Sequence, residues 1–289
     1  MLPPREAVRT VIAATLVVAG LLLVDFFVPT LFTWGESFGA FLAIGFCIGQ
    51  LNLVATWAAL ARGNPALRLP WAFLLTILLW YSLVVGNRVH NRYFSLGEAI
   101  FLGALLVSGC LVAQIPLWIA SRVAGVRLLP PSVGVGGAGP AEGQFRLWHL
   151  LLAMVLLSLA IAPLKAVLPP GDSLWPDNLP IARAALILSA LAVCNLLITV
   201  PCIWGAFLPR RLLIPVGLGW TVYCGILTAV EIGMLSLLIR MPQSIGEMFP
   251  DFYTINFSQC MVVFGVLLIF RAIGFTLLRV QRVPIGDAT

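Results

Sequence analysis

Long apolar runs separated by short polar breaks dominate the pattern along this chain. A run of about 20 apolar residues can cross the hydrocarbon core of a bilayer as a helix, because a helix satisfies its backbone polar groups internally. Pro, Gly or charged residues separate every neighbouring pair of runs. The pattern predicts an all-α integral membrane bundle of eight transmembrane helices, over residues 10–29, 37–61, 68–87, 98–121, 146–168, 181–207, 212–239 and 257–279.

The composition agrees with a membrane location. Of the 289 residues, 61% are hydrophobic and only 10% are charged, whereas a soluble domain has about 25% charged residues. No polar stretch approaches the roughly 50 residues that a small soluble domain needs. These proportions exclude an ordinary soluble enzyme and a disordered chain, and they make the lipid bilayer the first expected partner.

Basic residues predict the orientation of the spans. If the N-terminus lies in the cytoplasm, most of the 17 Lys and Arg residues flank cytoplasmic ends of the spans. The positive-inside rule therefore predicts that both termini are cytoplasmic. Arginines at these ends meet anionic lipid headgroups, which accounts for the formal net charge of +6 without any binding to nucleic acid.

Short motifs that recur in chain order suggest an internal repeat. Asn52-Leu53-Val54-Ala55-Thr56 recurs 143 residues later as Asn195-Leu196-Leu197-Ile198-Thr199. Pro70 and Pro215 each open a span and lie 145 residues apart, and residues 102–107 resemble residues 264–269 at an offset of 162.

These recurrences predict two four-helix units, over residues 1–122 and 144–289, joined by a flexible, Gly- and Pro-rich cytoplasmic linker over residues 123–143. Four spans return the chain to the side on which it started. The two units are therefore expected to be parallel and related by a pseudo-two-fold axis along the membrane normal.

Cofactor and metal sites find little support in the sequence. The segment Gly134-Val135-Gly136-Gly137-Ala138-Gly139 has dinucleotide-loop spacing, but such a loop needs a strand before it and a helix within it. Pro130-Pro131 and Pro140 flank the segment and favour a linker. His90 and His149, the two histidines, are predicted on opposite sides of the membrane, and all six cysteines fall within spans. We expect no metal, no cofactor and no enzymatic activity.

Polar side chains within the spans are the remaining candidates for function. They are Asn52, Asn195, Gln114, Thr228, Glu231 and Arg271. For the Asn, Gln and Thr side chains, the simplest interpretation is hydrogen bonding between helices, worth about 0.6 kcal/mol per contact on average. Gly45 and Gly49 add a small-xxx-small pair that allows another helix backbone to approach closely.

The charged residues carry more information, because a charge at the bilayer centre costs about 2.5–3.5 kcal/mol on insertion scales. The predicted spans place Glu231 and Arg271 within reach of each other, so we expect either an ion pair that locks two helices or a substrate or proton path. Asp25 and Lys165 lie 140 residues apart, near the outer ends of the first span of each unit. Opposite charges at equivalent positions predict an inter-repeat charge pair.

The segment Gln144-Phe145-Arg146-Leu147-Trp148-His149-Leu150-Leu151-Leu152 resembles a helix start found in uncharacterised bacterial polytopic inner-membrane proteins. The resemblance implies a bacterial cytoplasmic-membrane location and no particular activity.

Two classes of function remain. The first is a non-enzymatic membrane protein that acts through helix–helix assembly, either as a homo-oligomer or with a membrane protein partner. The alternative is a secondary transporter of a small solute or ion, whose path runs between the two repeats past Glu231 and Arg271. A water-accessible cavity at Glu231 would favour transport.

Overall fold

The computed structural model describes residues 4–31, 38–61, 65–89, 96–123, 125–129, 181–239 and 245–279. These residues form the α-helices α1 (Pro4–Leu31), α2 (Phe38–Leu60), α3 (Pro65–Val89), α4 (Leu96–Val123), α6 (Ile181–Ala206), α7 (Leu213–Ile239) and α8 (Ile245–Ala272), the 3₁₀ turn η1 (Arg210–Leu212), and the strands β1 (Val126–Leu129) and β2 (Thr276–Arg279). The predicted span over residues 146–168 lies outside the described residues.

Five of these helices are long and apolar enough to cross a membrane. They are α2, α3, α4, α7 and α8. Shorter apolar stretches occur in α1 (Thr15–Phe27) and α6 (Val193–Ala206). Helices of this length and apolarity are typical of membrane spans, and they support a membrane location for the chain.

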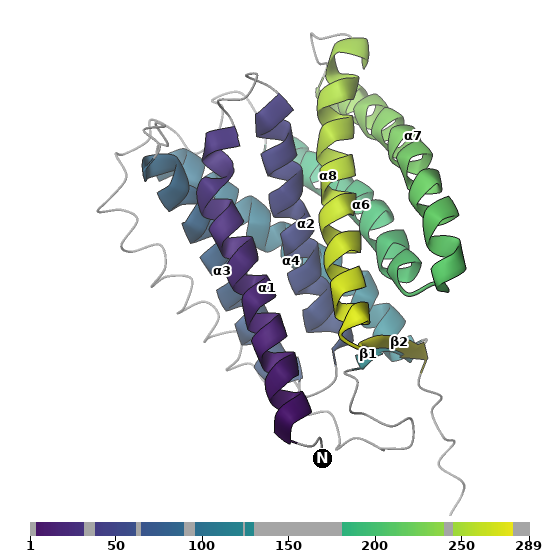
Figure 1. Ribbon diagram of the computed structural model, residues 1–289. Helices are drawn as coiled ribbons and strands as arrows, with labels where there is room; N and C mark the ends of the chain where they lie inside the picture. The colour runs from purple at the N-terminus through teal and green to yellow at the C-terminus, as the bar shows by residue number, and fades with distance from the viewer. Residues whose placement is uncertain are drawn as a thin grey trace, which may run out of the picture.

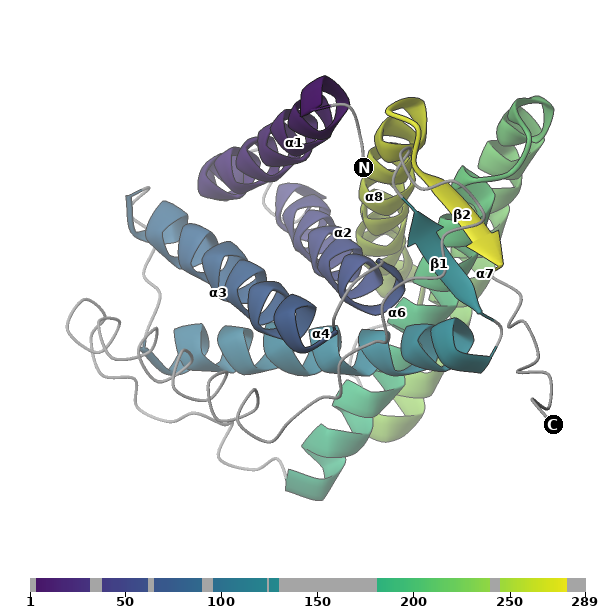
Figure 2. The ribbon, with the colours of Figure 1, turned by 90° about the horizontal axis from the view of Figure 1, so that it is seen from below.

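Helices α2 and α8 pack side by side through the middle of the bundle (Figure 1). Helices α1 and α3 flank α2 on one side, whereas α6 and α7 flank α8 on the other. Helix α4 packs on α2 and α3 on the face away from α1 (Figure 2). The two halves of the chain therefore meet chiefly through one central helix pair.

Glycines of α2 allow this close contact. A Cβ atom placed on Gly45 would lie 2.0 Å from Ser258 Oγ and 2.2 Å from the Ile255 carbonyl oxygen of α8. A Cβ atom on Gly49 would lie 2.8 Å from the Cβ of Val262. The small-xxx-small pair of α2 is thus used within the chain, where it brings two helix backbones together.

The last helix differs from its predicted span. The sequence pattern predicts residues 257–279, but α8 begins at Ile245 and ends at Ala272. Glu247, Pro250 and Asp251 suggest a polar loop, yet all three lie in the first two turns of α8, where an acidic side chain meets the positive end of the helix dipole. Pro250 is the sixth residue of α8, so the helix continues past it although its missing N–H leaves the Gly246 carbonyl without that backbone donor.

A two-stranded ribbon corrects the all-α prediction. Strands β1 and β2 pair antiparallel, with Leu128 opposite Leu277. Each strand follows a glycine with positive φ, Gly125 at 66° and Gly274 at 102°, a conformation that commonly ends helices. Residues 126–129, expected in a flexible linker, are therefore ordered as β1. The ribbon lies at the same end of the bundle as the start of α1 (Figure 1).

Helices α4 and α8 also match in length and in flanking sequence. Both have 28 residues, and their ends lie 149 residues apart. Each begins with Leu or Ile followed by Gly-Glu, and each leads into the pattern Arg-x-x-Gly-x-x-Leu-Leu, which starts at Arg122 and at Arg271. An alignment of these helix bounds has an offset of 149 in place of the predicted 162, and it matches Arg122 with Arg271.

Candidate functional site

Buried polar side chains, together with the half-buried Asn195, form a layer that crosses the bundle from α1 to α7. We call this group the polar layer; its members are Asp25, Gln50, Asn52, Thr56, Asn195, Thr199, Thr228, Glu231, Asn256 and Gln259. Each is hydrogen-bonded in the structure. Such pairing is expected in an apolar interior, where an unsatisfied polar group is costly.

The centre of the polar layer is a reciprocal amide pair. Asn52 Nδ2 donates to Asn195 Oδ1 at 2.7 Å, and Asn195 Nδ2 donates to Asn52 Oδ1 at 3.0 Å. One turn later, the Thr56 and Thr199 hydroxyls donate to the carbonyls of Asn52 and Asn195, respectively. The two copies of the recurring motif therefore meet through identical residues and make the same local hydrogen bonds.

Gln259 of α8 joins this pair. Its Nε2 atom donates to Asn195 Oδ1 at 2.6 Å and lies 3.2 Å from Thr199 Oγ1. The predicted span placed Gln259 near a membrane surface, and sequence reasoning therefore missed it. Its spacing of three residues from Asn256, on one face of a helix, is the signal that could have found both.

Glu231 lies in a second part of the polar layer, between α7 and α8. Asn256 Nδ2 donates to Glu231 Oε2 at 2.8 Å and to Thr228 Oγ1 at 3.0 Å. The Glu231 side chain is only 7% exposed. Asn256 was predicted to lie in an outer loop, because the start of α8 was placed too late.

Arg271 does not meet Glu231. Its guanidinium donates to the carbonyl oxygens of Ala206, at 2.9 Å, and of Leu208, at the end of α6. The last carbonyls of a helix lack intrahelical partners, so Arg271 stabilises this end. Arg271 and Asn256 lie fifteen residues apart on α8, about 22 Å along its axis. The expected ion pair is therefore wrong: Arg271 lies in the last turn of α8, not near its middle.

Asp25 is fully buried between α1 and α2. Gln50 Nε2 donates to Asp25 Oδ1, while Asp25 Oδ2 has no hydrogen-bond partner among the described residues. The side chain is 0% exposed. Lys165, its expected charge partner, lies outside the described residues, so the inter-repeat charge pair stays a prediction.

Gln114 and two of the cysteines make contacts of their own. Gln114 Nε2 donates to Cys110 Sγ at 3.2 Å, one turn back on α4. Cys224 and Cys260 bring α7 and α8 together with a sulfur–sulfur distance of 3.2 Å. All six cysteines are buried free thiols, and the described part of the chain holds no group of three or more His, Cys, Asp or Glu side chains placed to bind a metal ion.

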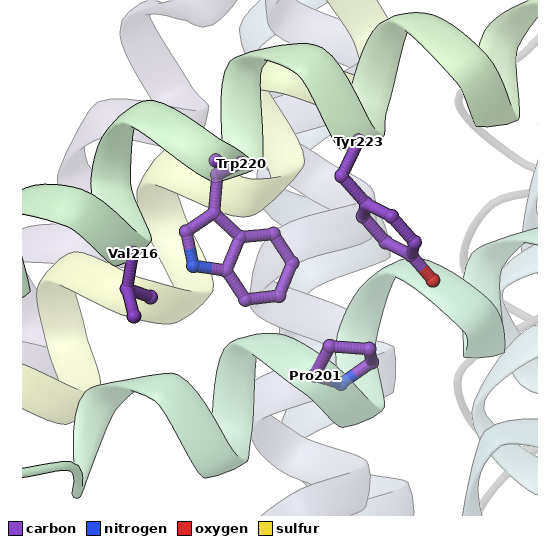
Figure 3. A pocket seen from close by; sticks show the side chains of 5 residues that line it. Pro201, Val216, Trp220 and Tyr223 are labelled. Atoms are coloured by element: carbon purple, nitrogen blue, oxygen red, sulfur yellow. The ribbon is translucent and has the colours of Figure 1, made fainter.

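An apolar groove of about 230 Å³ lies between α6 and α7 (Figure 3). Its lining residues are Pro201, Val216, Gly219, Trp220 and Tyr223. Pro201 has no backbone N–H for the carbonyl of Leu197, and the Tyr223 hydroxyl donates to that carbonyl at 2.7 Å instead. The Trp220 indole nitrogen is buried and has no acceptor among the described residues.

The arrangement holds no assembled acid, base and nucleophile within the described residues, and its chemistry is hydrogen bonding between helices. No family of proteins, curated protein or solved structure matches this chain.

Proposed function

We propose that this chain is a non-enzymatic, multi-pass protein of the bacterial inner membrane that acts through helix–helix assembly with itself or with membrane protein partners. It comprises eight transmembrane helices in two parallel four-helix repeats, with both termini in the cytoplasm. The observation that carries the assembly role is the outward apolar face of α7.

Two pairings support the repeat. A two-fold axis brings some residues opposite their own counterparts, as in an isologous interface. At an offset of 143 residues, Asn52 is hydrogen-bonded to its counterpart Asn195. At an offset of 149 residues, Leu128 is paired with its counterpart Leu277 in the ribbon. Both pairings are expected if one pseudo-two-fold axis passes through the bundle and the ribbon.

Helix α7 lies at the edge of the bundle (Figure 1), and only 17% of its membrane window is buried. Large apolar side chains stand exposed along its outward face at Leu218, Val222, Ile226 and Val230. Ala229 and Gly233 follow the same face, four residues apart. Small residues at this spacing allow a second helix to approach closely. By contrast, Gly45 and Gly49 are covered by α8 and are not available for assembly.

Cysteine cross-linking in native membranes tests the assembly role. Because the six native cysteines are buried, a Val222→Cys variant adds one reactive thiol to the outward face. We expect a disulfide-linked dimer or a cross-link to a membrane partner, reduced about tenfold by Ala229→Leu and Gly233→Leu, since larger side chains hold the helices apart.

Leu111→Cys on the exposed surface of α4 serves as the control for random collision. Equal cross-linking from the positions of Val222 and Leu111, or cross-linking that persists in the Leu variants, would contradict assembly through α7.

Secondary transport is the second candidate, and Asp25 favours it. A buried carboxyl group with one unpartnered oxygen among the described residues is a frequent element of ion and proton paths. If protons reach Asp25 and Glu231 from water, a hydrophobic carbodiimide should modify both carboxyl groups, faster at pH 5 than at pH 8, as read by peptide mass spectrometry.

The variants Asp25→Asn and Glu231→Gln identify the modified residues. Absence of modification at both carboxyl groups over this pH range removes the transport candidate and leaves the amide contacts as helix-packing interactions.

A further inference from the structure

The α6–α7 groove opens beside two exposed arginines. Arg210 and Arg211 form η1, directly before α7, and both are exposed. Val216, the first groove residue of α7, follows Arg211 by five residues, or about 8 Å along a helix axis. Residues 181–230 contain no Asp or Glu, so no carboxylate of α6 or of this part of α7 offsets the two positive charges. The end of the groove nearest η1 therefore lies close to two positive charges, and the wall of the groove is apolar.

Trp220 adds a polar atom inside the apolar wall. Its indole ring lies between Val216 and Pro201 (Figure 3). A Cβ atom on Gly205 would lie 3.3 Å from both the Trp220 Nε1 atom and a methyl group of Val216, so the indole N–H lies at the Val216 end of the groove. This N–H group has no acceptor among the described residues. Because this nitrogen is buried, a ligand in the groove would contact the indole ring of Trp220 and not its N–H group.

These features follow one another in the same order as the parts of a phospholipid. Along the chain from η1, two exposed arginines come first and the apolar lining of the groove, from Val216 to Tyr223, follows. A phospholipid presents a phosphate and then acyl chains in the same order. Tryptophan at the membrane–water interface commonly places its ring in the apolar region.

We propose that the α6–α7 groove binds one anionic phospholipid. Arg210 and Arg211 hold its phosphate, and an acyl chain lies against Pro201, Gly219 and the ring of Trp220. An anionic headgroup is favoured over a zwitterionic one because two positive charges face it and no carboxylate of the neighbouring segment opposes them. The site is separate from the outward face of α7, so it does not depend on the assembly role.

Tryptophan fluorescence in vesicles tests the site directly. The full-length protein is reconstituted in phosphatidylcholine–phosphatidylglycerol vesicles in which one lipid carries brominated acyl chains, which quench nearby indoles. We expect brominated phosphatidylglycerol to quench more strongly than brominated phosphatidylcholine at equal mole fraction, and we expect Trp220→Phe to abolish the difference. Replacing both Arg210 and Arg211 with Gln should reduce the preference for phosphatidylglycerol roughly 5- to 30-fold.

Two glycines offer a matched pair of variants for the groove itself. A Cβ atom on Gly219 or on Gly217 meets no other atom within 4 Å, so both positions accept a larger side chain. Only Gly219 lines the groove. Gly219→Leu should therefore remove the lipid preference, and Gly217→Leu should keep it. A double variant with Arg122→Gln and Arg127→Gln controls for the loss of two charges near the ribbon end of the bundle.

Three results would overturn the proposal. They are equal quenching by the two brominated lipids, a preference that survives the Arg210 and Arg211 replacements, and a preference that survives Gly219→Leu. If another helix of this chain or a second copy occupies the groove, neither lipid quenches Trp220, which also contradicts the proposal.

Discussion

Replacement of Gly45 by alanine is expected to lower the free energy of unfolding by about 3 kcal/mol or more. The added methyl group would lie 2.0 Å from Ser258 Oγ and 2.2 Å from a backbone oxygen of α8. The hydroxyl of Ser258 can rotate away, but the backbone oxygen cannot move without the helix. Alanine therefore forces α2 and α8 apart at the central contact of the bundle. Thermal unfolding of the detergent-solubilised protein measures the loss.

Gly233→Ala is the matched control for this change. A Cβ atom on Gly233 meets no atom within 4 Å, and alanine favours a helix over glycine by about 1 kcal/mol. We expect this variant to unfold at the same temperature as the native protein or slightly above it. Similar unfolding temperatures for the two alanine variants would show that α2 and α8 are not in close contact.

Asn195→Leu is expected to cost about 2 kcal/mol, and Asn52→Leu about 1 kcal/mol. The difference between the two expected losses of stability follows from the hydrogen bonds that each asparagine makes. Loss of Asn52 removes the partner of one amide, whereas loss of Asn195 removes the acceptor of both Asn52 and Gln259. Unfolding in detergent of the two single variants and of the double variant measures these differences.

The double variant distinguishes a reciprocal pair from two independent contacts. Because Asn195→Leu already leaves Asn52 without its partner, adding Asn52→Leu should cost nothing further. Gln114→Leu provides a control, since this amide bonds only to Cys110 of its own helix among the described residues. Additive losses in the double variant, or a larger loss from Asn52→Leu than from Asn195→Leu, would contradict the observed geometry.

The hydrophobic pattern predicted the helices well where a clear polar break separates two apolar runs. It failed at α8, because Glu247, Pro250 and Asp251 suggest a loop when only composition is considered. The position of a helix start depends on capping and on the helix dipole, and the polarity of neighbouring residues in the sequence does not show where these act. The predicted start, residue 257, lies 12 residues after Ile245, which is more than three helical turns. This error moved Arg271 toward the membrane centre and produced the wrong pairing with Glu231.

The candidate site was predicted unevenly for a related reason. Asn52 and Asn195 stand out because they recur in the same short motif. Asn256 and Gln259 carry the same kind of side chain, yet no motif marks them, and an incorrect helix start placed both outside the membrane interior. The partners of Glu231 and Asn195 could therefore be identified only after α8 was positioned against α6 and α7.

The sequence by itself indicated a helical membrane protein, because the length and apolarity of a span follow from the thickness of the bilayer alone. It also singled out Asn52 and Asn195, which recur in the same short motif. Only the tertiary structure decided which polar groups meet, since hydrogen bonds join residues on different helices and depend on helix rotation and depth. The close approach at Gly45, the cap by Arg271 and the β1–β2 ribbon all arise from such contacts between distant segments.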